Sequence, residues 1–160
     1  TAFFLMTFFI LSCDQISQER NTMTYNKFSQ DNRISEKFGK TEKLKINIEI
    51  RGEILTASLE NNETTQDLLK LLPMTITMKD LYESEKYAEL PVELSGAGVS
   101  RQGYEIGDIG YWAPGNCLVI YYKQTGEIIN GLQILGKIDE NINIFEKNKN
   151  SVIVRISKSD

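Results

Sequence analysis

Carboxylates, tyrosines and two cysteines are the side chains of this 160-residue chain that could do chemistry, because the sequence contains no histidine. The absence of histidine excludes a Ser-His-Asp or Cys-His nucleophile relay and any zinc site with imidazole ligands. Two cysteines are too few for a thiolate cage or an iron–sulfur cluster. Aspartate and glutamate are plentiful, but no spacing marks a carboxylate pair for glycoside hydrolysis. We therefore expect no metal, no cofactor and no catalytic residue of these kinds.

Four candidate ligand-binding residues fall in the longest irregular stretch of the pattern, residues 80–103: Tyr82, Glu85, Lys86 and Tyr87. Arg101 lies near the end of the same stretch. Loops often carry binding residues, since a rigid scaffold can present them. The alternative interpretation is that Glu85 or Lys86 ties the loop to the rest of the domain through an ion pair or backbone contacts.

A second group of candidates is aromatic. Tyr111, Trp112 and Tyr122 lie on two neighbouring predicted strands, and Asn116, a residue type typical of turns, lies in the loop that joins them. Alternate side chains of a strand face opposite sides of a sheet. Some of these rings therefore belong to the core, and others are candidates for lining a surface groove that binds a ligand.

The N-terminal residues 2–11, AFFLMTFFIL, form an uncharged apolar run. Its length is typical of the hydrophobic region of a secretory signal, roughly 7–15 residues, and falls below the roughly 18 residues of a membrane-spanning helix. The basic segment that precedes such a region is missing, so we expect the signal to be truncated at its start. A buried core helix is the alternative, which the polar stretch that follows disfavours.

Residues 10–13, ILSC, resemble the lipobox of bacterial lipoproteins, in which a small residue precedes the cysteine that becomes lipidated. The resemblance implies a signal peptide over residues 1–12, lipidation of Cys13, and export to the bacterial cell envelope with attachment to a membrane. Acyl chains contribute about 0.8 kcal/mol per buried CH₂, so several chains on one cysteine anchor a protein stably. The alternative is a disulfide between Cys13 and Cys117, although Cys117 lies in an apolar strand where we expect a buried free thiol.

The rest of the chain divides into a tether and one domain. Residues 13–42, with the lipidated cysteine at their start, are polar and carry mixed charges without a hydrophobic period, which is typical of a flexible segment. A short helix over residues 31–38 is the alternative. Residues 43–160 alternate apolar and polar side chains in several short runs, which predicts strands. The expected strands are residues 43–50, 54–59, 74–79, 104–112, 117–123, 128–138 and 152–156.

Short helices complete the predicted domain. Thr64 followed by Asp67 resembles a capping box ahead of a helix with its apolar face at residues 68–72, and residues 141–148 can form one or two helical turns. Gly131 and Gly136 are expected to be bulges or points of close approach. Seven or eight short strands with one or two short helices predict a mainly β fold, a closed antiparallel β-barrel, because closure removes exposed sheet edges.

Six short motifs from residue 43 to the C-terminus resemble the bacterial cyclophilin-like domain family, and they occur in its order and spacing. The motifs are LLPMTITM (71–78), EKY (85–87), LP (90–91), GDI (107–109), PGNCL (114–118) and GKID (136–139). The resemblance implies a cyclophilin-like barrel. It does not imply prolyl isomerase activity, because true cyclophilins carry an arginine in a Phe-His-Arg strand. This domain has no Phe-x-Arg segment, and its arginines are Arg51, Arg101 and Arg155.

The expected function is therefore a non-catalytic, lipid-anchored binding module of the cell envelope, with a peptide segment, a protein or a small molecule as its ligand. The alternatives are a divergent prolyl isomerase or another enzyme that uses carboxylates and tyrosines, and a structural protein whose barrel docks on a partner. Nucleic acid is not an expected partner, because the formal net charge is −4 and no long basic stretch offsets it.

Overall fold

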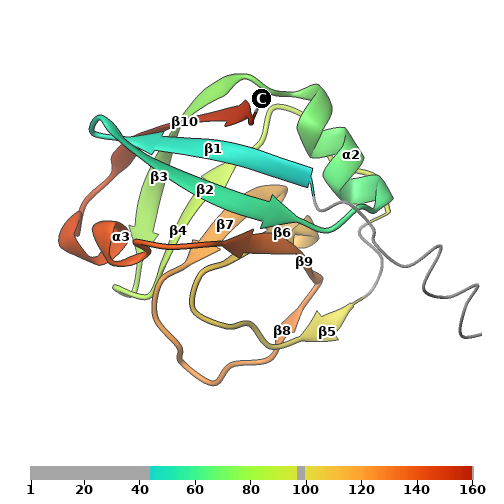
Figure 1. Ribbon diagram of the computed structural model, residues 1–160. Coiled ribbons are helices and arrows are strands. Elements are labelled where there is room, and N and C mark those ends of the chain that lie inside the picture. The colour runs from blue at the N-terminus through green and yellow to red at the C-terminus, as the bar shows by residue number, and fades with distance from the viewer. Residues whose placement is uncertain (1–43, 97–99, 160) are drawn as a thin grey trace, which may run out of the picture. The chain divides into compact units, whose positions relative to one another are not determined.

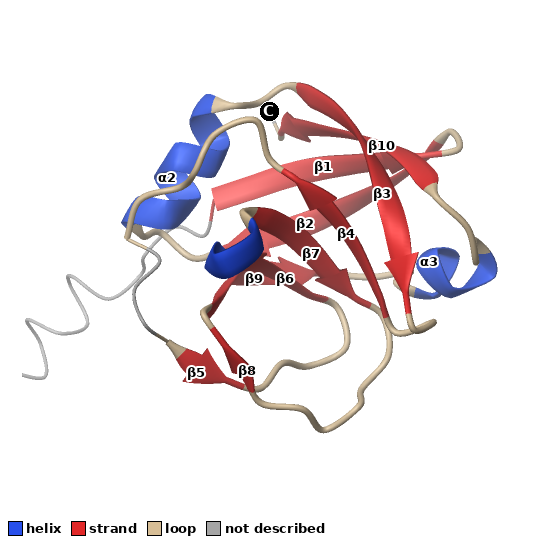
Figure 2. Cartoon of the chain, turned by 180° about the vertical axis from the view of Figure 1, so that it is seen from behind, coloured by secondary structure: helices blue, strands red, loops and turns tan. Residues whose placement is uncertain are grey.

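A computed structural model describes residues 44–96 and 100–159 of the chain (Figures 1 and 2). The predicted signal segment, Cys13 and the tether lie outside these residues. The elements, in chain order, are β1 (Leu44–Ile50), β2 (Glu53–Leu59), α2 (Glu63–Lys70), β3 (Met74–Leu81), β4 (Glu85–Glu89), β5 (Arg101–Gln102), β6 (Asp108–Trp112), η1 (Ala113–Gly115), β7 (Cys117–Tyr121), β8 (Ile129–Asn130), β9 (Leu132–Ile138), α3 (Asn143–Lys147) and β10 (Val152–Lys158). In the described part of the chain, no helix has the length and apolar character needed to cross a membrane.

Eight of the strands form a closed barrel in the order β1-β10-β3-β4-β7-β6-β9-β2. Every pairing in the barrel is antiparallel, so the predicted closed antiparallel barrel is confirmed. The predicted alternation decides which side chains fill it. Ile46, Ile48 and Ile50 of β1 are buried, as are the alternate apolar residues of β10. Each such side chain stabilises the fold by about 1.5–3 kcal/mol relative to exposure.

The two α-helices lie at opposite ends of the barrel (Figures 1 and 2). Asn62 caps α2, because its side chain accepts a hydrogen bond from the backbone N–H of Thr65 at 2.9 Å. The predicted capping box at Thr64 and Asp67 is therefore wrong. Both side chains instead hold Ser95 against the helix: the Thr64 hydroxyl donates to the Ser95 carbonyl at 2.7 Å, and Asp67 accepts from the Ser95 N–H at 2.9 Å.

Residues 80–103 are less irregular than the sequence indicates. Strand β3 runs to Leu81, and a tight turn leads directly into β4, which carries Glu85 and Lys86 on a strand rather than in a loop. Tyr82 and Glu83 both have positive φ, 53° and 51°, and the Ser84 N–H donates to the Leu81 carbonyl at 3.1 Å, which closes the turn. The sequence hides this turn because neither position is the glycine or asparagine that normally marks it.

Close approach explains both glycines singled out in the sequence, and a Cβ at Gly131 would overlap the Pro114 ring. A Cβ at Gly136 of β9 would overlap the Ser58 carbonyl and Leu59 of the neighbouring strand β2. The register between β6 and β9 also shifts between Ile109 and Gly110, beside Gly136. The expectation of close approach is confirmed at both Gly131 and Gly136.

Strand β7 is buried on both faces. Leu118, Ile120 and the following Tyr122 face the barrel interior, whereas Val119 and Tyr121 belong to a second apolar cluster on the outside. Strands β5 and β8 form a separate two-stranded sheet, and Figure 1 shows this sheet and the loops attached to it beside the barrel. This second layer shelters the outer face of β7 and creates the walls of a cavity.

Candidate ligand-binding cavity

A cavity of about 390 Å³ lies between the outer face of the barrel and the 122–128 loop with β8. Its aromatic lining comes from Tyr82, Tyr87, Trp112 and Tyr121, its other apolar lining from Leu81, Cys117, Val119 and Ile129, and its polar lining from Ser84, Glu85 and Glu127. A mostly apolar concavity with a few polar groups is the usual form of a small-molecule site. The sequence-predicted candidates that line it are Tyr82, Glu85, Tyr87 and Trp112.

Strand register brings the floor of the cavity together. Glu85 of β4 is the partner of Tyr121 in β7, and Tyr87 is the partner of Val119 two residues along. Residues two apart on a strand share a face, and paired residues of neighbouring strands share it too. The floor is therefore built on paired barrel strands, and only the outer wall depends on loops.

Trp112, the only tryptophan of the chain, is held at the cavity by two contacts. Its indole N–H donates to the backbone carbonyl of Asn130 in β8 at 3.1 Å. Its ring lies against Gly115, where any Cβ would overlap the ring atoms. The side chain remains 38% exposed, so a ligand entering the cavity can reach it.

Glu85 is a half-buried carboxyl group without a partner: it makes no side-chain hydrogen bond or ion pair within residues 44–96 and 100–159. Burial, followed by the negative charges of Glu127 and Asp80, raises its pKa from an ordinary 4.5 to about 7. Near neutral pH this carboxyl therefore exists in both its protonated and its ionised form.

Tyr121 is a buried residue that lines the same cavity. The residue is 1% exposed, and its ring stacks on Tyr104 with the centroids 3.8 Å apart and an interplanar angle of 14°. Tyr104 is fixed in turn by a 2.6 Å hydrogen bond between its hydroxyl and that of Thr125. The Tyr121 hydroxyl has no hydrogen-bond partner in the described ranges. Burial, then the charge of Glu85, raises its pKa, so the hydroxyl keeps its proton.

Cys117 carries a buried free thiol at the cavity wall. Burial raises the pKa of this thiol, and the nearby carboxylates Glu89 and Glu85 raise it further. A thiol with a raised pKa is a poor nucleophile, because the thiolate is the reactive form. Cys117 therefore acts at the cavity as a small apolar group.

Lys86 and Tyr122, two further predicted binding residues, lie inside the barrel instead, and this corrects their assignment. The Lys86 ammonium is 0% exposed and donates to Asp80 and to the backbone carbonyls of Asn148 and Asn150. The Tyr122 hydroxyl donates to the same Asp80 oxygen at 2.6 Å, and its ring centroid lies 5.5 Å from the ammonium. Lys86 thus ties the segment before β10 to the barrel, as the alternative interpretation of this residue expected.

Electrostatics favour this internal network. Burial alone would raise the pKa of Asp80, but the hydrogen bonds from Lys86 and Tyr122 outweigh burial and hold that pKa below its ordinary value. Burial and the bond to Asp80 raise the pKa of Tyr122. Asp80 is therefore ionised opposite the ammonium, and the network has no polar group to spare for a ligand.

Tyr111 and Asn116 also serve the fold rather than the cavity. Tyr111 is 1% exposed, and its hydroxyl donates to Asn116 at 3.0 Å and accepts from the Leu94 N–H at 3.2 Å. The Asn116 amide donates to the Leu90 carbonyl at 2.9 Å. Together they fasten residues 90–94 to the barrel. Arg101 is exposed on β5 and does not line the cavity.

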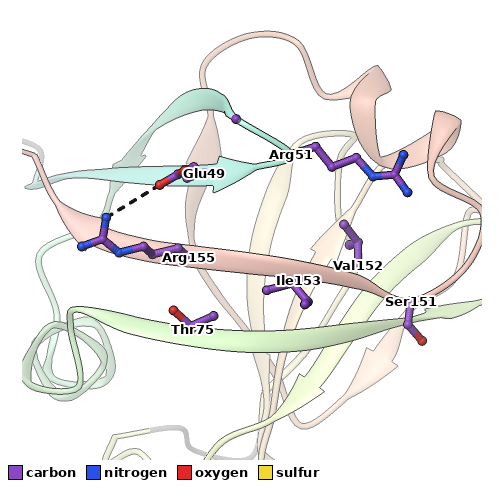
Figure 3. A pocket seen from close by; sticks show the side chains of 8 residues that line it. Glu49, Arg51, Thr75, Ser151, Val152, Ile153 and Arg155 are labelled. Carbon is purple, nitrogen blue, oxygen red and sulfur yellow. Dashed lines mark ion pairs between the residues drawn. The ribbon is translucent and has the colours of Figure 1, made fainter.

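A second concavity, of about 520 Å³, lies over β1, β3 and β10 (Figure 3). Its two arginines do not converge: Figure 3 shows the Arg51 and Arg155 side chains extending in opposite directions, with Arg155 paired to Glu49 at 3.7 Å. The exposed Ile153 lies between them. Because the charged side chains of this surface do not converge on a common point, the cavity at Glu85 is the better candidate site.

No group of three or more histidine, cysteine, aspartate or glutamate side chains within residues 44–96 and 100–159 is arranged to hold a metal ion. The oxygen-bearing side chains of the cavity are two carboxyls, three phenols and one serine hydroxyl. Such a set can bind a ligand through hydrogen bonds and charge. Its chemistry is that of recognition, or of proton transfer by Glu85.

Comparison with known proteins agrees with the barrel and the sequence motifs. Residues 48–157 match the model of the cyclophilin-like family, and the chain belongs to this family. A hypothetical protein from Archaeoglobus fulgidus, whose structure was determined in solution, is similar in fold, with a TM-score of 0.55 and 16% sequence identity. The match covers 76% of this chain and 99% of that one. No curated protein was found to match the chain.

Sequence reasoning missed Cys117, Val119, Glu127 and Ile129 as cavity residues. For Cys117 and Val119 a signal was available, because the unbroken apolar run at β7 indicates a strand buried on both faces. Glu127 and Ile129 carry no comparable signal. Their place in the wall depends on how the 122–128 loop packs back on the barrel.

Proposed function

We propose that this cyclophilin-like domain is a binding module of the bacterial cell envelope, anchored through a lipidated Cys13, whose cavity receives a small molecule or a peptide side chain. The supporting observation is the cavity itself: about 390 Å³, mostly apolar, and lined by the Glu85 and Glu127 carboxyls and the Tyr121 hydroxyl, which have no hydrogen-bond partner among the described residues. Polar groups that have no internal partner and line an apolar cavity are available to bind a ligand.

Prolyl isomerisation is less well supported as a function. Lowering its barrier requires a donor at the proline nitrogen in the twisted state. None of the described arginines, at positions 51, 101 and 155, lines the cavity. A second candidate is an enzyme that transfers a proton through Glu85, which rests on the pKa of about 7. Consumption of a bound ligand would favour this candidate over simple binding.

Binding of N-phenyl-1-naphthylamine, an uncharged dye that fluoresces in apolar surroundings, tests the proposal. The wild-type chain should bind the dye, and Ile129→Trp should abolish this binding by filling the cavity from β8. Ile153→Trp is the matched control, because the same substitution falls on the exposed surface of the second concavity. Dye binding that survives Ile129→Trp, or that both variants weaken equally, would contradict the proposed site.

A further inference from the structure

The cavity has a strongly asymmetric set of charges. Among the described residues, its lining includes two carboxyl groups, Glu85 and Glu127, and no lysine or arginine. The nearest buried cation on the same strand, Lys86, faces the opposite side of the sheet and is neutralised by Asp80. Glu85 is half-buried and Glu127 is exposed, and after burial itself the charge of Glu127 is the next cause of the raised pKa of Glu85. A cationic group bound between the two carboxylates would relieve this repulsion.

The walls suit a cation with an apolar body. Tyr82, Tyr87, Trp112 and Tyr121 line the cavity, and the faces of aromatic rings attract ammonium groups within about 6 Å. The fully buried ring of Tyr121 is held rigidly by its stack on Tyr104. An inorganic cation would make no apolar contacts with these walls, and an anion would be repelled by the two carboxylates.

One more polar group points to an organic ligand. Tyr121 is only 1% exposed, and its hydroxyl has no hydrogen-bond partner among the described residues. A hydroxyl can donate one hydrogen bond and accept two. It can therefore serve the ammonium itself or a polar atom of the ligand body.

We infer that the ligand of this cavity carries an alkylammonium group on an apolar body, with Glu85 and Glu127 as its counter-charges and the aromatic walls around it. The inference rests on the proposed binding function and specifies its ligand. Two sources share this chemistry: a small aromatic or aliphatic amine, and the side chain of a lysine in a peptide.

Benzylamine and benzyl alcohol test the inference with the full chain at about pH 8, where Glu85 is ionised and benzylamine is charged. The two probes have nearly the same shape and differ in charge. Calorimetry, with the Trp112 emission as a second readout, should show benzylamine binding at least tenfold more tightly than benzyl alcohol. N-acetyl-lysine methylamide distinguishes the sources: tighter binding than benzylamine indicates a lysine side chain, and weaker binding a small amine.

Matched variants locate the effect. Glu85→Gln should reduce the preference for benzylamine by about tenfold, and Glu127→Gln should reduce it in the same direction. Glu89→Gln is the control, because Glu89 faces outward on the same strand as Glu85 but does not line this cavity. The Glu89→Gln variant should keep the wild-type preference for benzylamine over benzyl alcohol. Equal effects of Glu85→Gln and Glu89→Gln would show general surface charge and overturn the inference.

Failure of the inference and failure of the proposed function are distinguishable. Equal affinities for benzylamine and benzyl alcohol overturn the ammonium inference and leave a binding cavity. Absence of benzylamine binding in a chain that binds N-phenyl-1-naphthylamine at the cavity also contradicts the inference alone. Absence of binding for all of these probes contradicts the proposed function and the inference together.

Discussion

Replacing Lys86 with methionine should destabilise the domain more than any surface substitution. The variant keeps an unbranched side chain but removes the ammonium that serves Asp80 and the carbonyls of Asn148 and Asn150. Removing one partner of a buried ion pair costs about 3–5 kcal/mol, because the other charge stays buried without compensation. We expect the lower end of this range, since Asp80 keeps its hydrogen bond from Tyr122.

Urea denaturation followed by Trp112 fluorescence and circular dichroism measures this cost as a lower midpoint at an unchanged slope. Lys45→Met is the control, because Lys45 pairs with Asp139 at 3.6 Å with both side chains exposed, 55% and 37%. Such surface pairs contribute less than about 1 kcal/mol. Adding Asp80→Asn to Lys86→Met should recover part of the loss, because it removes the uncompensated charge. A Lys86→Met variant that loses no more stability than Lys45→Met would refute this reasoning.

Four further expectations concern the anchor, the cavity, the tether and catalysis. Cys13→Ser should abolish incorporation of a fatty-acid analogue and release the protein from membranes. Labelling that persists in this variant would contradict lipidation at Cys13. The pKa of Glu85 in the folded chain, about 7, is higher than its ordinary value of 4.5, so the folded chain binds this proton more tightly than the unfolded chain does. The stability that this proton contributes is fully present below about pH 4.5 and is lost as the pH rises through 7. Glu85→Gln should therefore melt above the wild type at pH 8 and alongside it at pH 4, and identical pH profiles would count against the raised pKa. A chain beginning at Lys43 should melt within a few degrees of one beginning at Asp14, and a large drop would mean that the tether packs on the barrel. The chain should not accelerate proline isomerisation in a short peptide, and an acceleration abolished by Arg101→Ala would contradict this.

Much of the barrel was predictable because one face of most strands is buried and the other is not. The period-two pattern at β1 and β10 follows directly from this asymmetry. The turn at Tyr82 and Glu83 was not predictable, because its positive φ angles fall on residues that rarely adopt them. Without that turn, strand β4 could not be recognised in the sequence.

The hidden strand also explains which binding residues the sequence placed wrongly. Glu85 and Lys86 are neighbours in sequence, but on β4 they face opposite sides of the sheet, one in the cavity and one in the core. Assigning these residues to a loop does not predict that neighbouring side chains face opposite sides. Glu127 could not be identified in advance, because it reaches the cavity only through the packing of the 122–128 loop.

Intermolecular nuclear Overhauser effects between the chain and bound N-phenyl-1-naphthylamine would test the central claim most directly. The claim is that ligands bind in the cavity on the outer face of β4 and β7. We predict contacts from the dye to the side chains of Val119, Tyr121 and Ile129, which line that cavity. Contacts to Thr75 and Ile153 instead would place the ligand in the second concavity and contradict the account.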